Sequence, residues 1–521
     1  MKTSGTVLRS QTVAGVSPSR LVGIVLVIFT FLALIPDIRA DNSTWLLNPL
    51  SGDWNTGANW STGTVPGDIA TFDVSNVTNV SVSAFTPINQ VVFDSSASPF
   101  VITVLPNQLL EVLGEGMANS SSNSENFVMT VDNSGKAGHC SFFSGTVSGS
   151  VFFTNYGAMV PGGEAGSADF NLDATAGDAT YHSFGSTVSG GIGGQMTFLN
   201  TASAANSTII NDGGTVPGAG SGATFFVVAT PTGGNAILIA NGGSNGGNGG
   251  SFSFTDGSTG GTARIEVFGN GYLDISNHNG ASLTIGSIEG DGLIYLGKAT
   301  LLTGSNSLST TFSGVLQPGA PGGGGRGTGA LSKIGTGTLT LSGANLYTAG
   351  MTVSAGTLVT SNMTGSATGT GAVQVNAGTL GGSGIIAGAV TVGTGSGTGA
   401  FLAPAHGTKT QATLTIQSAL TFNADATYTY TFKAKKKKAK TDKVIANGVT
   451  INGAAFSFQG TPQGRLKQGL VLTAISNTAA TPIAGTFSNL ADGAILTVSG
   501  NNFQASYEGG DGDDLTLTVV P

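Results

Sequence analysis

The sequence predicts an all-β protein, an elongated parallel β-helix or β-solenoid with a capped N-terminal module and a β-rich C-terminal closing region. Charged residues make up only 9% of the 521 residues, and 84 are glycine, so turns are abundant and strong helix formers scarce. The tripeptide Gly-Thr-Leu also recurs at Gly337, Gly356 and Gly378, at intervals of 19 and 22 residues. Self-similarity at such a period is typical of stacked coils.

The segment LSKIGTGTLTLSGANLYTAGMTVSAGTLV (331–359) shows the repeat best, with β-rich runs at Gly337–Leu341 and Gly356–Val359. Glycine supplies the positive φ of a tight coil corner, and Thr and Leu alternate as a strand with one buried face requires. No coil can bury its own apolar side alone, so neighbouring coils must stack. Asn345 is expected to join a side-chain ladder between coils.

This segment resembles the autotransporter-associated β-strand repeat of bacterial secreted proteins. The resemblance implies an extracellular or surface β-solenoid, mostly without an assigned activity. Proteins that export their own passenger carry a C-terminal membrane barrel of segments of about ten alternating residues. The residues after 445 lack that pattern, so we expect the repeat without the barrel. Similar stretches lie at 43–75, 260–276, 283–297 and 506–520.

The first forty residues predict a signal peptide (1–40). Lys2, Arg9 and Arg20 precede an apolar run at 21–35, which is too short for a typical membrane-spanning helix. An uncleaved anchor is the alternative. No later segment is apolar enough to span a membrane as a helix, so we expect a secreted protein or one on the outer cell surface.

Net charge disfavours nucleic acid as a partner, and the cysteine content excludes disulfide bonds within the chain. Without the first forty residues the chain has 15 basic and 26 acidic residues, a net charge of −11, which disfavours nucleic acid as a partner. Cys140 is the only cysteine, so no intramolecular disulfide can form.

The remaining chain divides into four regions by composition. We expect an N-terminal β module with a Trp-rich cap (41–112), a Gly-rich β-solenoid (113–330), the repeat region (331–400) and a C-terminal β closing region (401–521). Loops are expected at 241–250 and 318–329. Strands of the Gly-rich region are predicted at Phe225–Val228, Ile237–Ile239, Ile265–Phe268 and Tyr272–Ile275.

Trp45, Trp54 and Trp60 lie within sixteen residues of one another, beside Asn and Asp side chains. Exposed aromatic rings beside polar groups can stack on sugars, so the three tryptophans are candidate glycan-binding residues. The alternative, which we favour, is that these rings plug the open end of the solenoid, because terminal coils must be capped.

A lysine run follows the alternating strand ATYTYTF (426–432). A solvated hairpin loop is the favoured interpretation, and contact with an acidic polysaccharide, lipid headgroups or a neighbouring acidic chain is the alternative. The resemblance does not explain this run. The candidate polyanion-binding residues are Lys435, Lys436, Lys437 and Lys438.

We predict no metal site and no cofactor. The closing GGDGDDLTL (509–517) has the glycines of a calcium-binding nonapeptide, but Thr516 stands where an apolar residue belongs, and such coils need tandem copies. His139 and Cys140 are a lone pair of possible ligands, and the four histidines show no metal spacing.

An enzyme would need paired carboxylates or a basic partner in a groove. None of the acidic candidates has a basic partner close by in the sequence. Gly242–Gly246 matches the nucleophile-elbow pattern only within a glycine run. The acidic candidates are Glu289 with Asp291, Asp169 with Asp173, and Glu111 with Glu115.

These observations favour a secreted or cell-surface structural or adhesin-like β-solenoid without catalytic activity. The alternative is a carbohydrate-binding or polysaccharide-degrading protein built on a β-helix. The expected partners are extracellular polysaccharide or neighbouring copies of the same chain, with no membrane span after removal of the signal.

Overall fold

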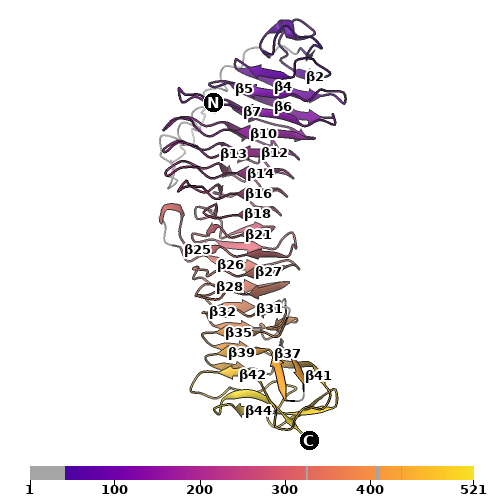
Figure 1. The fold of residues 1–521 in the computed structure, drawn as a ribbon, viewed down its shortest axis with the longest axis vertical. Coiled ribbons are helices and arrows are strands. Elements are labelled where there is room, and N and C mark those ends of the chain that lie inside the picture. The colour runs from indigo at the N-terminus through magenta and orange to yellow at the C-terminus, as the bar shows by residue number, and fades with distance from the viewer. Residues whose placement is uncertain (1–40, 324–326, 407–409, 436) are drawn as a thin grey trace, which may run out of the picture.

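The computed structural model describes residues 41–323, 327–406, 410–435 and 437–521. The predicted signal peptide (1–40) and Lys436 therefore lie outside the described residues. The chain forms a long column of stacked coils with the N-terminal coils at one end and the C-terminal strands at the other (Figure 1). Long parallel sheets run along this column, which confirms the predicted all-β solenoid.

Two long sheets build the column, the first over its N-terminal half and the second over most of its length (Figure 1). In the first, β9 (Thr146–Ser148) pairs with β6, and in the second, β38 (Lys438–Thr441) pairs antiparallel with β37. The first sheet has the order β1 (Ser43–Thr44), β2 (Ile69–Phe72), β4 (Thr86–Phe93), β6 (Leu109–Asn119), β8 (His139–Phe142), β11 (Ser167–Phe170), β13 (Gln195–Asn200), β15 (Ala223–Ala229), β17 (Ser251–Phe254), β19 (Tyr272–Asp274), β22 (Leu293–Tyr295) and β25 (Val315–Gln317). The second has the order β3 (Asn79–Val82), β5 (Val101–Val104), β7 (Glu125–Met129), β10 (Val151–Asn155), β12 (Thr180–Ser183), β14 (Thr208–Asn211), β16 (Ile237–Ala240), β18 (Arg264–Val267), β21 (Ser287–Gly290), β24 (Thr310–Phe312), β27 (Thr338–Leu341), β29 (Thr357–Thr360), β31 (Gly378–Gly382), β34 (Ala400–Leu402), β37 (Ala426–Lys435) and β41 (Ala455–Gln463).

Two further sheets complete the C-terminal half, and short 3-10 turns lie at η1 (Gly57–Asn59) and η2 (Pro321–Gly323). The third sheet has the order β20 (Ser282–Ile285), β23 (Thr300–Thr303), β26 (Ala330–Lys333), β28 (Met351–Val353), β30 (Val373–Val375), β33 (Val390–Val392), β36 (Leu420–Phe422) and β40 (Val449–Ile451). The fourth has the order β32 (Ile385–Ile386), β35 (Thr413–Ile416), β39 (Lys443–Ala446), β42 (Val471–Asn477), β45 (Asp514–Val520), β44 (Asn501–Gly509) and β43 (Ile495–Val498). Its last three pairings are antiparallel, so the stack of parallel coils ends in a β-rich closing region, as predicted.

The Gly-Thr-Leu copies occupy equivalent places in successive coils. Leu339, Leu358 and Leu380 pair in register across β27, β29 and β31, and all three are buried. Gly356 and Gly378 have φ values of 65° and 84°, as a tight corner requires. Each copy of the tripeptide is therefore one coil of the solenoid.

The predicted side-chain ladder at Asn345 is wrong, because this side chain bonds to backbone groups of the neighbouring coils. The Asn345 Oδ1 atom accepts a hydrogen bond from the Leu316 amide at 2.8 Å, and Nδ2 donates to the Ala367 carbonyl at 2.6 Å. The buried amide thus bridges the backbones of the two adjacent coils and does not stack on another asparagine. Buried backbone groups need such partners where a corner interrupts the strand pairing.

A row of stacked phenylalanines fills the core of the Gly-rich region. Five rings from successive coils lie with centroids 4.3 to 5.0 Å apart and planes within 10° of parallel. They recur every 28 residues, so β8, β11, β13, β15 and β17 each contribute one ring. The rings are Phe142, Phe170, Phe198, Phe226 and Phe254, and each is buried.

The strands predicted for this region are present, as β15, β16, β18 and β19, and 241–250 is a loop between β16 and β17. Strand β6 runs through residue 112, where the N-terminal module was expected to end. No helix among the described residues is long and apolar enough to cross a membrane.

Candidate functional site

The tryptophans lie in the core at the N-terminal end of the column. Trp45, Trp54 and Trp60 are at most 1% exposed. The Trp60 ring packs edge-on against Trp45 and Trp54, with centroids 5.1 and 5.2 Å away, and against Phe72 at 5.5 Å. No ring face is open to a ligand, so glycan stacking on the tryptophans is wrong for this structure. Large rings that close an open coil end bury far more apolar surface than they would by stacking on a sugar.

His139 and Cys140 do not form a ligand pair. They are consecutive in β8, and consecutive side chains of a strand point to opposite faces. Cys140 is buried, and this burial raises the pKa of its thiol, which keeps it protonated. His139 Nδ1 instead lies 3.0 Å from Ser167 Oγ on the neighbouring strand β11.

Asp169 completes a short polar chain with these residues. Ser167 Oγ donates to Asp169 Oδ2 at 2.8 Å, and burial raises the pKa of that carboxyl. The serine lies between the histidine and the carboxylate, whereas a nucleophilic triad needs the histidine between the other two. The geometry therefore does not activate Ser167. Burial also raises the pKa of Glu111 on β6, the strand that pairs with β8.

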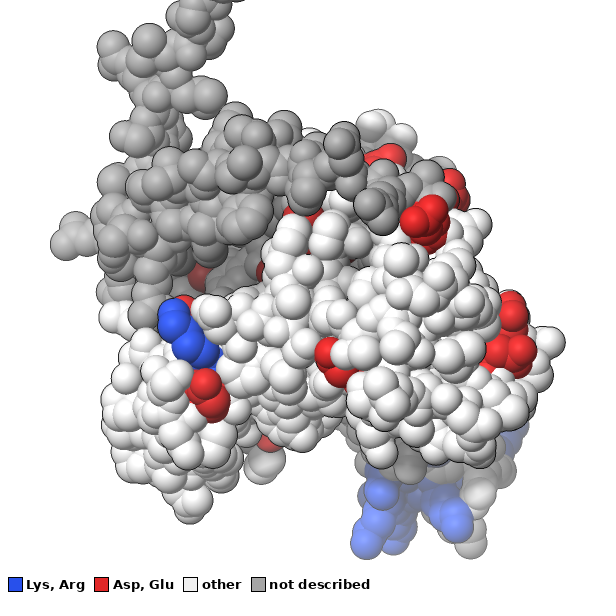
Figure 2. All heavy atoms as spheres, turned by 90° about the horizontal axis from the view of Figure 1, so that it is seen from above, with Lys and Arg blue, Asp and Glu red and all other residues white. Residues whose placement is uncertain are grey.

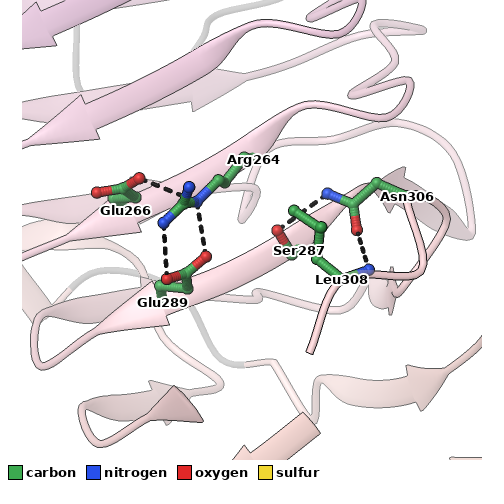
Figure 3. Close-up of polar contacts among 6 residues, drawn as sticks. All are labelled: Arg264, Glu266, Ser287, Glu289, Asn306 and Leu308. Carbon is green, nitrogen blue, oxygen red and sulfur yellow. Dashed lines mark hydrogen bonds and ion pairs between the residues drawn. The ribbon is translucent and has the colours of Figure 1, made fainter. Parts of the chain in front are cut away.

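Glu289 has a basic partner that the sequence did not reveal. Arg264 of β18 donates from Nε to Glu289 Oε1 at 2.7 Å and from a terminal nitrogen to Oε2 at 3.0 Å (Figure 3). The same Nε lies 3.0 Å from Glu266, and the hydrogen bond with Glu289 raises the pKa of Arg264. Asp291 points elsewhere, because it accepts from the Gly269 amide. One guanidinium thus holds two carboxylates on the outer face of the second sheet.

A hollow of about 410 Å³ lies beside this cluster. Its lining includes Glu289, Phe268 and threonines of β24 and β27. Both oxygens of Glu289 are already engaged in a bidentate ion pair, which leaves no free carboxylate pair for general acid–base catalysis. The arrangement ties β18 to β21 and borders a polar hollow.

A second and larger hollow, of about 620 Å³, runs along the column over five coils. We call it the axial trough. Its lining includes the residues that follow β10, β12 and β14, the residues three positions further on, and Gly242 and Ser244 after β16. One wall carries Tyr156, Phe184 and Asp212, and the other carries Met159, Thr187, Thr215 and Ser244.

Glycines make the floor of the axial trough. Gly157, Gly185 and Gly213 each follow a first-wall residue, and Gly242 holds the equivalent place in the next coil. A Cβ atom on Gly185 would lie 2.1 Å from the carbonyl oxygen of Gly213, so only glycine lets these coils stack at this point. The floor therefore has no side chains, and the two walls stand above it.

The first wall changes from aromatic to polar along its length. Tyr156 and Phe184 stack with centroids 5.5 Å apart, and Tyr156 is 43% exposed. Asp212 follows, 2.6 Å from His182 Nε2, and accepts from Asn241 Nδ2 at 2.8 Å. Partial burial raises the pKa of Asp212, but the hydrogen bonds from His182 and Asn241 outweigh this effect and leave the pKa below its ordinary value.

The lysine run forms a hairpin, as the favoured interpretation predicted. Strands β37 and β38 pair antiparallel, with Lys433 opposite Lys440 and Lys435 opposite Lys438. Directly opposite residues lie on the same face, so these four exposed side chains share one surface, which we call the lysine face. Exposed Lys437 lies at the turn. None of the ion pairs within the described ranges includes these lysines.

Figure 2, viewed along the column, shows basic side chains gathered in a projection that extends beyond its outline, with acidic groups scattered elsewhere. Like charges placed directly opposite one another on a hairpin repel. A bound polyanion would relieve that repulsion, so the lysine face is a candidate polyanion-binding surface.

The closing segment brings three carboxylates together. Oxygens of Asp511, Asp513 and Asp514 lie within 4.8 Å of one another. Asp514 accepts from the Asn477 amide at 2.9 Å, and a hydrogen bond with Asp511 raises the pKa of Asp513. The crowding of carboxylates thus disfavours ionisation of Asp513, and we assign no metal to the group.

Lys333, which the sequence analysis did not single out, is buried in the repeat segment. Its ammonium donates to the carbonyls of Ile334, Gly335 and Ala355 at distances of 2.5, 2.9 and 3.4 Å. Replacing Lys333 with methionine should lower the free energy of unfolding by about 1–3 kcal/mol, because these carbonyls lose their partner. Chemical denaturation measures the loss, and an unchanged midpoint would contradict it.

Lys333 should also make the stability of the folded chain depend on pH. Burial lowers its pKa from 10.5 to about 8 in the folded chain. The unfolded chain therefore binds more protons between these values, so the stability that Lys333 contributes should increase as the pH rises from about 8 towards 10.5. This rise should be absent in Lys333→Met.

One known family matches the chain. The passenger-associated-transport-repeat matches residues 331–359, the segment that forms β26 to β29 of the column. This match confirms the resemblance drawn from the same residues. A search of the curated proteins gave no match. A passenger-associated repeat built into a parallel β-solenoid suggests a passenger-type protein, a class that is secreted or displayed on the cell surface.

Proposed function

From the passenger-associated-transport-repeat at residues 331–359, we propose that this chain is a secreted or outer-surface solenoid with a structural, adhesin-like role and no catalytic activity. One observation carries the proposal. The coils stack without interruption from β3 to β41, and the matched repeat continues this stack in register. Such a column projects a long, regular surface, and few of its groups are poised for chemistry.

The lysine face is the adhesive contact in this proposal. Four exposed lysines on one hairpin face provide a dense positive charge on a chain that is otherwise acidic. Such a surface attracts an acidic polymer and is screened by salt. We propose an extracellular acidic polysaccharide as the ligand, with anionic lipid headgroups and a second copy of the chain as outcomes of the test.

We expect the purified chain to be retained on immobilised alginate at low salt and released as salt increases. Replacing Lys433, Lys435, Lys438 and Lys440 with glutamine should reduce the retention at least about tenfold, since most of the electrostatic attraction is lost. Lys298→Gln, an exposed lysine on a different coil, is the control and should change little.

Two parallel measurements test the other possible sources of the negative charge that the lysine face would bind. Anionic vesicles test lipid headgroups, and sedimentation of the free chain at low salt tests self-association. Retention on alginate that survives the four substitutions would contradict the role of the lysine face. Protease treatment of intact source cells checks the location, because an outer-surface protein should be cleaved without lysis.

A second candidate is a polysaccharide-degrading enzyme, and the hollow beside Glu289 is the observation that favours it. The bidentate pairing of Glu289 with Arg264 argues against it. An assay of the sugar ends released from alginate and from neutral glycans distinguishes the enzyme from the structural protein. Release that disappears in Glu289→Gln would replace the structural proposal with an enzymatic one.

A further inference from the structure

The axial trough is lined by two rows of residues that recur at equivalent places in successive coils. The amides of Tyr156, Phe184, Asp212 and Asn241 each donate to a carbonyl of the preceding coil. These residues therefore hold equivalent places, one coil above the other. At about 4.8 Å per coil, five coils give a trough about 19 Å long. A site of this length and shape fits an extended polymer that lies parallel to the column.

The chemistry of the walls defines the polymer. Aromatic rings and Met159 offer apolar surface at one end, and the carboxylate and hydroxyl groups of Asp212, Thr187 and Thr215 offer hydrogen bonds along the rest. Sugar rings present an apolar face and a rim of hydroxyls, so they match both parts. Largely apolar grooves with a few polar groups are the usual form of ligand sites.

Other extended polymers fit less well. A peptide strand would need free backbone groups on a sheet edge. The first wall has none at Tyr156, Phe184 and Asp212, because their amides and carbonyls are already hydrogen-bonded. An acidic polymer would be repelled, because residues 41–212 contain 14 acidic residues and one basic residue. A neutral polymer meets neither obstacle.

We propose that the axial trough binds a neutral, linear polysaccharide, with Tyr156 and Phe184 as its apolar contacts and Asp212 and Thr215 as acceptors or donors for sugar hydroxyls. This site is separate from the lysine face and takes a ligand of different charge. It extends the proposed surface role with a second specificity. Binding by the purified chain does not depend on where the protein is located.

Affinity electrophoresis of the purified chain tests the proposal, with gels that contain a β-glucan, a xylan or a mannan. We expect at least one of these neutral polymers to retard the chain, at low and high salt alike. The double variant Tyr156→Ala/Phe184→Ala should bind about tenfold more weakly or worse, since aromatic contacts dominate such sites. Phe401→Ala is the matched control, because Phe401 is 36% exposed and lies on β34 outside the trough.

The outcomes separate the two sites. Retardation lost in the double variant but kept in Phe401→Ala and in the four-lysine variant supports the trough. Unchanged binding by the double variant, or no retardation by any neutral polymer, overturns it. Circular dichroism must show the same melting for the double variant and the parent chain, and Asp212→Asn provides a second variant that keeps the side-chain shape. Retention on alginate alone would support the lysine face and overturn the trough.

Discussion

Replacing Phe198 with alanine should lower the free energy of unfolding by about 3–5 kcal/mol, the usual loss for a large buried aromatic ring. Phe198 stacks on Phe170 at 5.0 Å and on Phe226 at 4.8 Å, and it is fully buried. Alanine leaves a cavity between two rings that belong to different coils. The coils cannot close this gap, because their spacing is fixed by strand pairing on both sides.

Hydrogen exchange is the sharpest measurement for this variant. A long stack of coils need not unfold in one step, so protection should fall most in β11, β13 and β15. The matched control is Phe401→Ala, an exposed ring whose loss should cost little. Equal effects of the two substitutions would show that the stacked rings add nothing beyond their coils.

Replacing Trp60 with alanine should cost about 3–5 kcal/mol as well, and the loss should appear first at the N-terminal end of the column. Trp60 Nε1 donates to the Trp54 carbonyl at 2.7 Å, and the ring contacts Trp45, Trp54 and Phe72. Its removal opens the end that these rings close. Hydrogen exchange in β2 and β4 measures this opening.

Trp54→Phe is the control that separates packing from hydrogen bonding. Trp54 Nε1 is buried and has no hydrogen-bond partner among the described residues, so Trp54→Phe loses only part of the ring volume and should cost less than Trp60→Ala. If Trp60→Ala left stability unchanged but abolished retention on polysaccharide, the cap would be the wrong explanation and the glycan-stacking hypothesis would return.

Much of the fold could be predicted because its signals are local. The Gly-Thr-Leu repeat predicted stacked coils, and the pairing of Leu339, Leu358 and Leu380 confirms this. The lysine hairpin followed from the alternating strand before it. The 28-residue spacing of Phe142 and Phe170 was equally regular, and a search for aromatic periodicity would have found it.

The candidate sites were less predictable, because they depend on register between coils. Arg264 and Glu289 are 25 residues apart, and they meet only because β18 pairs with β21 in one register. The rows of the axial trough form at loop positions whose side chains differ from coil to coil, from Tyr156 to Asp212. The residues of such a site share a position within the coil repeat and not a residue type, so no sequence motif identifies them.

The direction of strand pairing has a mechanical consequence. Hydrogen bonds between successive coils run along the column, so tension between its two ends loads one coil interface at a time. Coils should peel away singly from whichever end is weaker, and the force should stay low while the chain lengthens. A column of this kind should yield gradually under load and re-form when the load falls, with the tryptophan-filled end setting the force at which peeling begins there.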